Sequence, residues 1–135
     1  MYESHFGLTG SPFALNPDPA FYFDSKGHAN ALAYLKFGVY QGEGFIVVTG
    51  DIGAGKTTVC RCFLAQGPED GQVGYIVNPK LSVAERLQTV AEEFGIAAPP
   101  PGPGGAVSVK AWVDVLNRHL LSAHARGQQC VLIID

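Results

Sequence analysis

A glycine-rich motif constrains the fold of this chain more than any other feature. The pattern G-x-x-x-x-G-K-[ST], typical of a phosphate-binding loop, is matched by Gly50, Asp51, Ile52, Gly53, Ala54, Gly55, Lys56, Thr57 and Thr58. The apolar run 45–49 before it predicts a buried strand. The unbroken stretch 59–66 after it predicts a helix that ends at Gly67-Pro68. Strand, glycine loop and helix in this order are the context in which the motif binds phosphate.

Each residue type in the motif has a chemical reason to be there. We expect Gly50, Gly53 and Gly55 to let the loop adopt backbone angles closed to other residues, so that its N–H groups turn toward phosphate oxygens. The helix that begins near Lys56 adds free N–H groups and the positive end of its dipole. Lys56 is expected to reach the β- and γ-phosphates, and the Thr57 hydroxyl to ligate Mg²⁺.

The end of the chain predicts a second part of the same site. The apolar run 130–134 indicates a buried strand, and Asp135 follows it directly, which is the Walker B pattern. Ligands of parallel sheets bind at the C-terminal edge of the strands, where both the glycine loop and Asp135 are expected. Asp135 is therefore expected to hold Mg²⁺ through a coordinated water. A strand that ends the sequence at this point suggests truncation after the Walker B strand.

Composition limits the class of protein. The chain has 135 residues, enough for one core, and its 47% hydrophobic and 16% charged residues exclude a disordered chain. A formal net charge of −3 gives no support for a nucleic-acid partner. The three cysteines (Cys60, Cys62 and Cys130) lack zinc or thioredoxin spacing and indicate reduced residues of a cytosolic protein. No apolar run approaches the ~20 residues of a membrane span.

The remaining elements predict an α/β fold with a parallel sheet. Ser25 is expected to cap a helix that runs to about Tyr40, and residues 73–77 to form a strand. Ser82 and Glu85 form a predicted capping box, and Ser108 caps a last helix. Trp112 is expected in the core. Three histidines are not expected to bind a metal: His28, interpreted as a surface or packing residue, and His119 and His124, which do not face each other.

The chain divides by composition into two parts. Residues 1–44 hold a segment rich in proline and aromatics and a helix, both expected to pack on the core, and residues 45–135 form the nucleotide-binding core. Within the core, residues 97–107 form a Pro/Gly-rich loop that is expected to be exposed. An alternative function for Tyr22 to Ser25 is to line the base-binding side of a nucleotide pocket.

The first half of the chain resembles a known family. The features that carry the resemblance precede the glycine loop in one ordered series: Phe6-Gly7-Leu8, Pro12-Phe13, Pro17-Asp18-Pro19, Phe21-Tyr22-Phe23, His28, Ala31-Leu32 and Gly42-Glu43-Gly44-Phe45. The series is similar to that of AAA+ secretion ATPases of the general secretion pathway protein A type, and of those at exosortase (PEP-CTERM) loci. The likeness is strong over residues 1–66, weaker over 67–129, and returns at the Walker B strand.

The resemblance implies a fold, ligands and partners. It implies a P-loop NTPase with three α/β/α layers and strand order 5-1-4-3-2, with the glycine loop on strand 1 and Walker B on strand 3. It implies ATP and Mg²⁺ as ligands, a cytoplasmic core often followed by a membrane segment, and a homo-oligomer that works with secretion-system proteins. The family's water-activating Glu, sensor and arginine finger would all follow Asp135, so residues 1–135 alone are expected to be inactive.

Three other functions remain open at this point. An AAA+ ATPase of DNA transposition has a similar core. A kinase or GTPase can carry the same glycine loop, and the guanine-selective N-K-x-D motif would normally follow Walker B. A nucleotide-gated scaffold would bind without turnover. A Glu directly after Asp135 would favour an ATPase, whereas a Gly soon after it would favour a GTPase.

Overall fold

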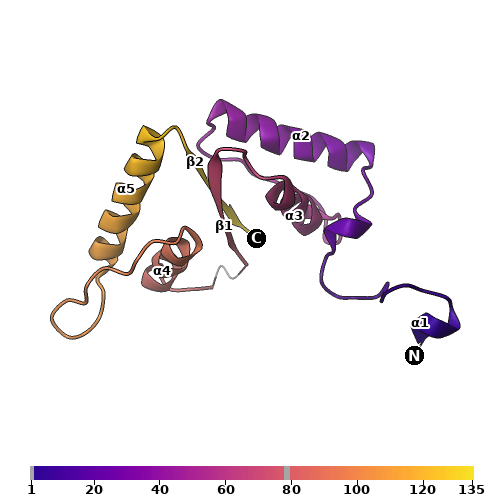
Figure 1. Ribbon diagram of the computed structural model, residues 1–135, viewed down its shortest axis with the longest axis horizontal. Coiled ribbons are helices and arrows are strands. Elements are labelled where there is room, and N and C mark those ends of the chain that lie inside the picture. The colour runs from indigo at the N-terminus through magenta and orange to yellow at the C-terminus, as the bar shows by residue number, and fades with distance from the viewer. Residues whose placement is uncertain (1, 78–79) are drawn as a thin grey trace.

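The chain folds as helices on both sides of a small parallel sheet (Figure 1). The computed structural model describes residues 2–77 and 80–135, so Met1 of the expected N-terminal segment lies outside the described residues. In chain order, the described elements are α1 (Tyr2–His5), the 3-10 turn η1 (Pro19–Phe21), α2 (Lys26–Gln41), α3 (Lys56–Gln66), β1 (Gly71–Ile76), α4 (Val83–Glu93), α5 (Val109–Ala125) and β2 (Gln129–Ile134). The four long helices confirm those predicted from the sequence.

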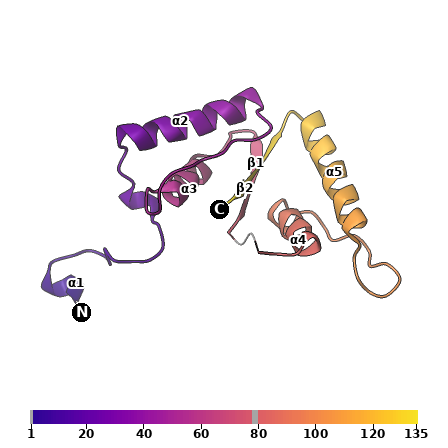
Figure 2. The ribbon, with the colours of Figure 1, turned by 180° about the vertical axis from the view of Figure 1, so that it is seen from behind.

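The sheet pairs β1 with β2 in parallel, with Gly71 opposite Gln129 and Ile76 opposite Ile134. Parallel neighbours need a crossover connection, which α4 and α5 supply between the two strands. Figures 1 and 2 show α2 and α3 on one side of the sheet and α4 and α5 on the other. The α/β prediction with a parallel sheet is confirmed by this arrangement.

Each side of the sheet has its own apolar cluster. On the α2–α3 side, Leu32, Cys62 and Phe63 surround Val59, which is only 2% exposed, and Val131 and Ile133 of β2 pack against them. On the other side, the cluster joins α4 to α5 and consists of Ala91, Trp112 and Leu116. The predicted core position of Trp112 is confirmed, since 5% of its surface is exposed.

Serine side chains start three of the long helices as predicted. The side chains of Ser25, Ser82 and Ser108 accept hydrogen bonds from backbone N–H groups in the first turns of α2, α4 and α5. Glu85 closes the capping box by accepting from the Ser82 N–H at 2.9 Å. These bonds satisfy N–H groups that a helix leaves unpaired at its start, which is why the short sequence signals located the helices well.

The strand predicted over 45–49 is wrong, because these residues are extended but pair with no strand among the described residues. Phe45 and Val47 are 97% and 81% exposed. A cavity of about 870 Å³ separates this segment from β2. A strand requires a hydrogen-bonded neighbour, which no local pattern specifies. The order implied by the family resemblance places a further strand between these two segments.

The N-terminal aromatics depart in part from the expected packing. Tyr22 packs against the α2–α3 cluster, whereas Phe6, Phe13 and Phe23 are largely exposed. Figures 1 and 2 show α1 standing away from the rest of the molecule. The contacts of this arm are local: Tyr2 lies 6.1 Å from Phe13 between ring centroids and hydrogen bonds to Ser11. Packing on the core therefore holds for Tyr22 and fails for these phenylalanines.

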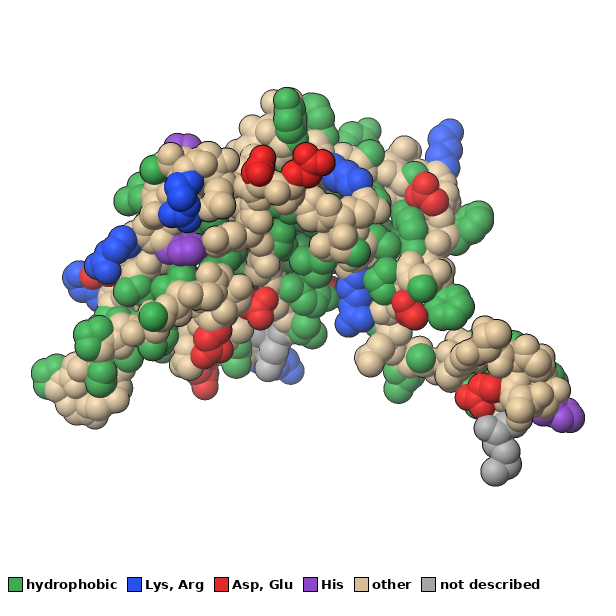
Figure 3. Space-filling view, viewed as in Figure 1, with side chains coloured by type: hydrophobic (Ala, Val, Ile, Leu, Met, Phe, Trp, Pro, Cys, Tyr) green, Lys and Arg blue, Asp and Glu red, His purple; other side chains and the backbone are tan. Residues whose placement is uncertain are grey.

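The outer surface is mixed in charge. On the face seen in Figure 3, lysine and arginine side chains are distributed with acidic side chains between them. The Pro/Gly-rich stretch 97–107 is exposed over most of its length, although Pro99 is buried. Among the described helices, none combines the length and apolar character needed to cross a membrane.

Candidate functional site

The glycine loop runs from the extended segment 45–49 into the start of α3. Gly53 and Gly55 have positive φ angles of 79° and 89°, a backbone region that side chains with a Cβ rarely adopt. Gly50 is different, because its φ is not positive and an added Cβ would make only ordinary contacts, the nearest at 3.5 Å from the Ala54 Cβ. The expected backbone freedom is thus used at Gly53 and Gly55, and the expectation for Gly50 is wrong.

The start of α3 differs from the starts of α2, α4 and α5. Gly55 occupies the N-cap position, and among the described residues no side chain caps this helix. The first N–H groups of a helix then remain available, together with the positive end of the dipole. This leaves donors for an anion at Lys56, Thr57 and Thr58, all of which are half-buried.

The Lys56 side chain folds back across the loop. Its Nζ donates hydrogen bonds of 2.8 Å to the backbone carbonyls of Gly50 and Asp51. The ammonium group therefore already lies beside the loop, held by two neutral acceptors. An anionic oxygen forms a stronger, charge-assisted bond with an ammonium group than a carbonyl does, so these two bonds are exchangeable for phosphate contacts.

Asp135 continues the face of β2 that packs toward α3. Side chains alternate along a strand, so Asp135 follows Val131 and Ile133 on the α2–α3 side, and its N–H extends the ladder to the Ile76 carbonyl at 2.9 Å. The Tyr75 hydroxyl donates a 2.7 Å hydrogen bond to Asp135 Oδ2. The other carboxylate oxygen, Oδ1, remains for a further ligand.

Two groups beside Asp135 carry its electrostatic influence. Burial, followed by the hydrogen bond to Asp135 and its charge, raises the pKa of Tyr75, and the Arg61 guanidinium acts in the opposite direction. Burial and the Asp135 charge raise the pKa of the Cys60 thiol. Arg61 also donates a 2.7 Å hydrogen bond to the Pro17 carbonyl and so ties the N-terminal arm to α3. No sequence pattern had indicated Tyr75 or Arg61.

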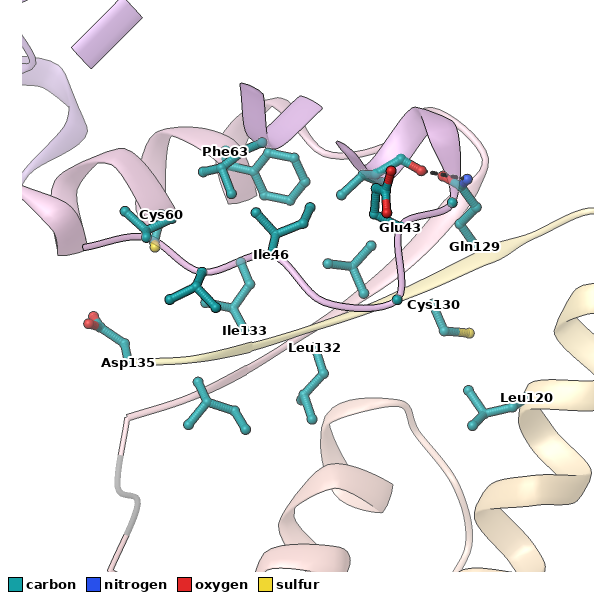
Figure 4. Close-up of a pocket in the computed structure, with 18 of the residues that line it drawn as sticks. Glu43, Ile46, Cys60, Phe63, Leu120, Gln129, Cys130, Leu132, Ile133 and Asp135 are labelled. Carbon is teal, nitrogen blue, oxygen red and sulfur yellow. Dashed lines mark hydrogen bonds between the residues drawn. The ribbon is translucent and has the colours of Figure 1, made fainter. Parts of the chain in front are cut away.

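One cavity joins the two ends of the expected site. The walls of the cavity between segment 45–49 and β2 include both Lys56 and Asp135. Figure 4 shows Cys60 and Asp135 at one end and Ile46, Phe63 and Ile133 pointing into the middle. In the part of the chain that the structure describes, no three His, Cys, Asp or Glu side chains gather into a metal cluster. Mg²⁺ does not need one, because it binds through one or two protein groups plus substrate phosphates and water.

A smaller pocket lies on the opposite side of the loop. It has a volume of about 270 Å³, and Phe21, Tyr22, Phe23, Ser25, His28, Gly55 and Thr58 line it. The Tyr22 hydroxyl donates to Asp24 at 3.1 Å, which fixes the ring beside His28 at 6.0 Å between centroids. The segment Tyr22 to Ser25 therefore borders the glycine loop, as its alternative base-binding function requires.

His28 is closer to the site than the sequence suggested. The hypothesis of a surface or packing histidine missed its contact with the loop, where Nε2 lies 2.8 Å from the Ala54 carbonyl oxygen. The residue stands 26 positions before Ala54, so local periodicity could not reveal the contact. Its place in the ordered series shared with the secretion ATPases was the one available signal.

Comparison with known proteins places the chain in a family. The family model described as AAA domain matches residues 39–135. The chain is 38% identical over its whole length to General secretion pathway protein A of Aeromonas hydrophila, of which it spans 24%. No solved structure was found to match the chain. With its parallel sheet and glycine loop, the chain belongs to the AAA domain family of P-loop nucleotide-binding proteins.

Proposed function

We propose that this chain is the ATP-binding part of an AAA+ ATPase that energises a bacterial secretion or envelope-assembly system. The observation that carries the proposal is the juxtaposition of an uncapped helix start with a charged pair. Gly55 opens α3 without a side-chain cap, and Lys56 and Asp135 line one cavity beside it. A triphosphate with its metal ion is the ligand that needs all three features.

The phosphates bind at the loop in this proposal. All nine motif residues, Gly50 to Thr58, surround the phosphate chain, and their N–H groups donate to its oxygens. Lys56 exchanges the Gly50 and Asp51 carbonyls for phosphate oxygens and stabilises the charge that develops during hydrolysis. The half-buried position of Lys56 keeps its ammonium group within reach of both sets of acceptors.

Mg²⁺ is held by Thr57 and Asp135 in this proposal. A hydroxyl and a carboxylate are the hard oxygen ligands that this ion prefers, so the residues present fit it. The bound ion neutralises charge on the β- and γ-phosphate oxygens. Tyr75 holds Asp135 Oδ2 and leaves Oδ1 toward the site, where it is expected to contact a coordinated water.

The base lies in the small pocket beside the loop. Aromatic rings of η1 and its flanking residues border this pocket, and stacking on such rings suits a planar base. Residues 45–135 then form the nucleotide-binding core, and residues 1–44 supply the base-binding wall. ATP is the nucleotide implied by the family, and the ATP over GTP preference belongs to the proposal.

The biological setting rests on the relative. The chain spans about a quarter of General secretion pathway protein A, so the role of the whole protein is part of the proposal. We propose a cytoplasmic location with an inner-membrane anchor outside residues 1–135, and homo-oligomers that contact secretion-system proteins. The distribution of charge in Figure 3 favours this setting over the DNA-transposition alternative, which needs a basic face.

Phosphate release by the intact protein tests the proposal. ATP should be hydrolysed in a Mg²⁺-dependent reaction, faster than GTP, and Asp135→Asn should abolish the reaction because it removes the carboxylate charge from the metal site. Asp70→Asn is the matched control, since Asp70 lies in an exposed turn before β1. GTP-selective turnover would favour the GTPase alternative. ATP binding without any turnover would favour the scaffold.

A further inference from the structure

We infer that His28 is a positioning residue that holds the Ala54–Gly55 peptide in the orientation needed for phosphate binding. The inference rests on the proposed function, because it concerns the same glycine loop. It assigns a role to a residue of α2 that lies outside the loop motif. The evidence consists of the hydrogen bonds of the imidazole, the geometry of the peptide and the contact with Gly55.

The hydrogen bonds of His28 specify one tautomer. The Ala54 carbonyl can only accept, so the Nε2 atom 2.8 Å away must carry the proton. Ser25 Oγ lies 2.9 Å from Nδ1 and accepts from the His28 backbone N–H at 3.3 Å. The Ser25 hydroxyl therefore donates to Nδ1, and the neutral ring satisfies every partner. The helix cap of α2 thus fixes the ring that contacts the loop.

The Ala54–Gly55 peptide transmits this contact to the phosphate site. A trans peptide is planar, so its C=O and N–H groups point in opposite directions. His28 holds the Ala54 carbonyl on the α2 side, which directs the Gly55 N–H away from α2. Within the described part of the chain, this N–H has no hydrogen-bond partner. It is one of the loop donors expected to face phosphate oxygens.

Gly55 and His28 also fit each other sterically. A Cβ added at Gly55 would lie 3.0 Å from His28 Nε2, in addition to the strain of a positive φ. The ring is carried by a helix that packs on α3 through Leu32 and Phe63, so it cannot retreat without disturbing the core. The imidazole and the loop therefore have one mutual arrangement, which preorganises the Gly55 donor before ligand binds.

Binding of inorganic triphosphate and of ATP, measured by calorimetry on the intact protein, tests the inference. His28→Phe keeps a planar ring and removes the donor, so it should weaken both ligands by about tenfold, the effect of one hydrogen bond to a charged group. His28→Gln retains an N–H donor and should recover most of the affinity. His5→Phe, on the exposed arm, is the matched control and should change neither ligand.

Two results would overturn the inference. Loss of ATP affinity with unchanged triphosphate affinity in His28→Phe would make the residue a base contact, since it also lines the base pocket. Unchanged affinity for both ligands would leave a packing role. If the wild-type protein bound neither ligand, the proposed function would fail together with the inference. If it bound both and lost them in Lys56→Ala but not in His28→Phe, only the inference would fail.

A measurement on the wild-type protein does not depend on any variant folding. Nitrogen NMR of the histidine rings should show His28 as the neutral tautomer with its proton on Nε2, coupled across the hydrogen bond to the Ala54 carbonyl. The same spectrum should show Nδ1 without a proton. A proton on Nδ1 of the neutral ring would contradict the contact and overturn the inference.

Discussion

The Tyr75 hydroxyl donates a 2.7 Å hydrogen bond to the carboxylate of Asp135, and this bond links the two strands beside the metal site. Tyr75 lies opposite Ile133 in the register of β1 and β2, so both residues of the pair face α3. The bond occupies Oδ2 and restricts the rotation of the carboxylate. Residues that hold a metal ligand in this way typically strengthen metal binding without touching the ion.

Tyr75→Phe should therefore weaken the response to Mg²⁺. We expect the Mg²⁺ concentration for half-maximal ATP binding to rise by about tenfold, as for other partners of metal ligands. ATP affinity in the absence of Mg²⁺ should not change, because the phosphate donors remain. Tyr40→Phe is the control, since Tyr40 is 81% exposed on α2. An unchanged Mg²⁺ titration would show that the hydrogen bond has no role in metal binding.

The charge of Asp135 should be visible in the chemistry of Cys60. Burial and the Asp135 charge raise the pKa of Cys60, so fewer thiolates are present at about pH 8 than in a free cysteine. Asp135→Asn removes the negative charge, lowers the pKa of Cys60 and should speed its alkylation, read by peptide mass spectrometry. Cys130 is the internal control, because burial raises the pKa of its thiol and Asp135 does not. Equal acceleration at both cysteines would indicate general loosening instead.

The sequence predicted local features well and long-range contacts poorly. Ser82 and Glu85 are three residues apart, and their capping box was visible in the sequence. Trp112 was predicted in the core because apolar residues share one face of its helix. By contrast, the partner of Tyr75 lies 60 residues away, and no pattern specifies such a pair. The strand predicted at 45–49 failed for the same reason, since strand formation depends on a distant neighbour.

Removal of residues 1–24 should separate base recognition from phosphate binding. The deletion takes away Phe21, Tyr22 and Phe23, which line the small pocket, and leaves the glycine loop in place. We expect ATP affinity to fall more than inorganic triphosphate affinity, measured by calorimetry. A shorter deletion of residues 1–16 is the control, because it keeps the Pro17 carbonyl that accepts from Arg61. Equal losses for both ligands in the longer deletion would leave these aromatics with a packing role alone.

Residues 1–135 expressed alone should show no ATP hydrolysis above background. Lys56, Thr57 and Asp135 supply phosphate and metal contacts in our proposal, and none of the described residues is assigned to activate water. The cavity beside β2 also leaves segment 45–49 without a strand partner among the described residues, which favours aggregation through unpaired edges. A longer natural chain should be active. Steady phosphate release by residues 1–135 that Lys56→Ala abolishes would place the water-activating group within this sequence.

Calorimetric titration of the intact protein with ATP, compared between wild type and Lys56→Ala, tests the central claim most directly. The Lys56 ammonium group lies at the loop, bonded to the Gly50 and Asp51 carbonyls. Its loss should lower ATP affinity by at least about tenfold, or about 1.4 kcal/mol. Lys36→Ala, on the exposed face of α2, should bind ATP like the wild type. ATP affinity that is the same in Lys56→Ala and in the wild type would contradict phosphate binding at this loop.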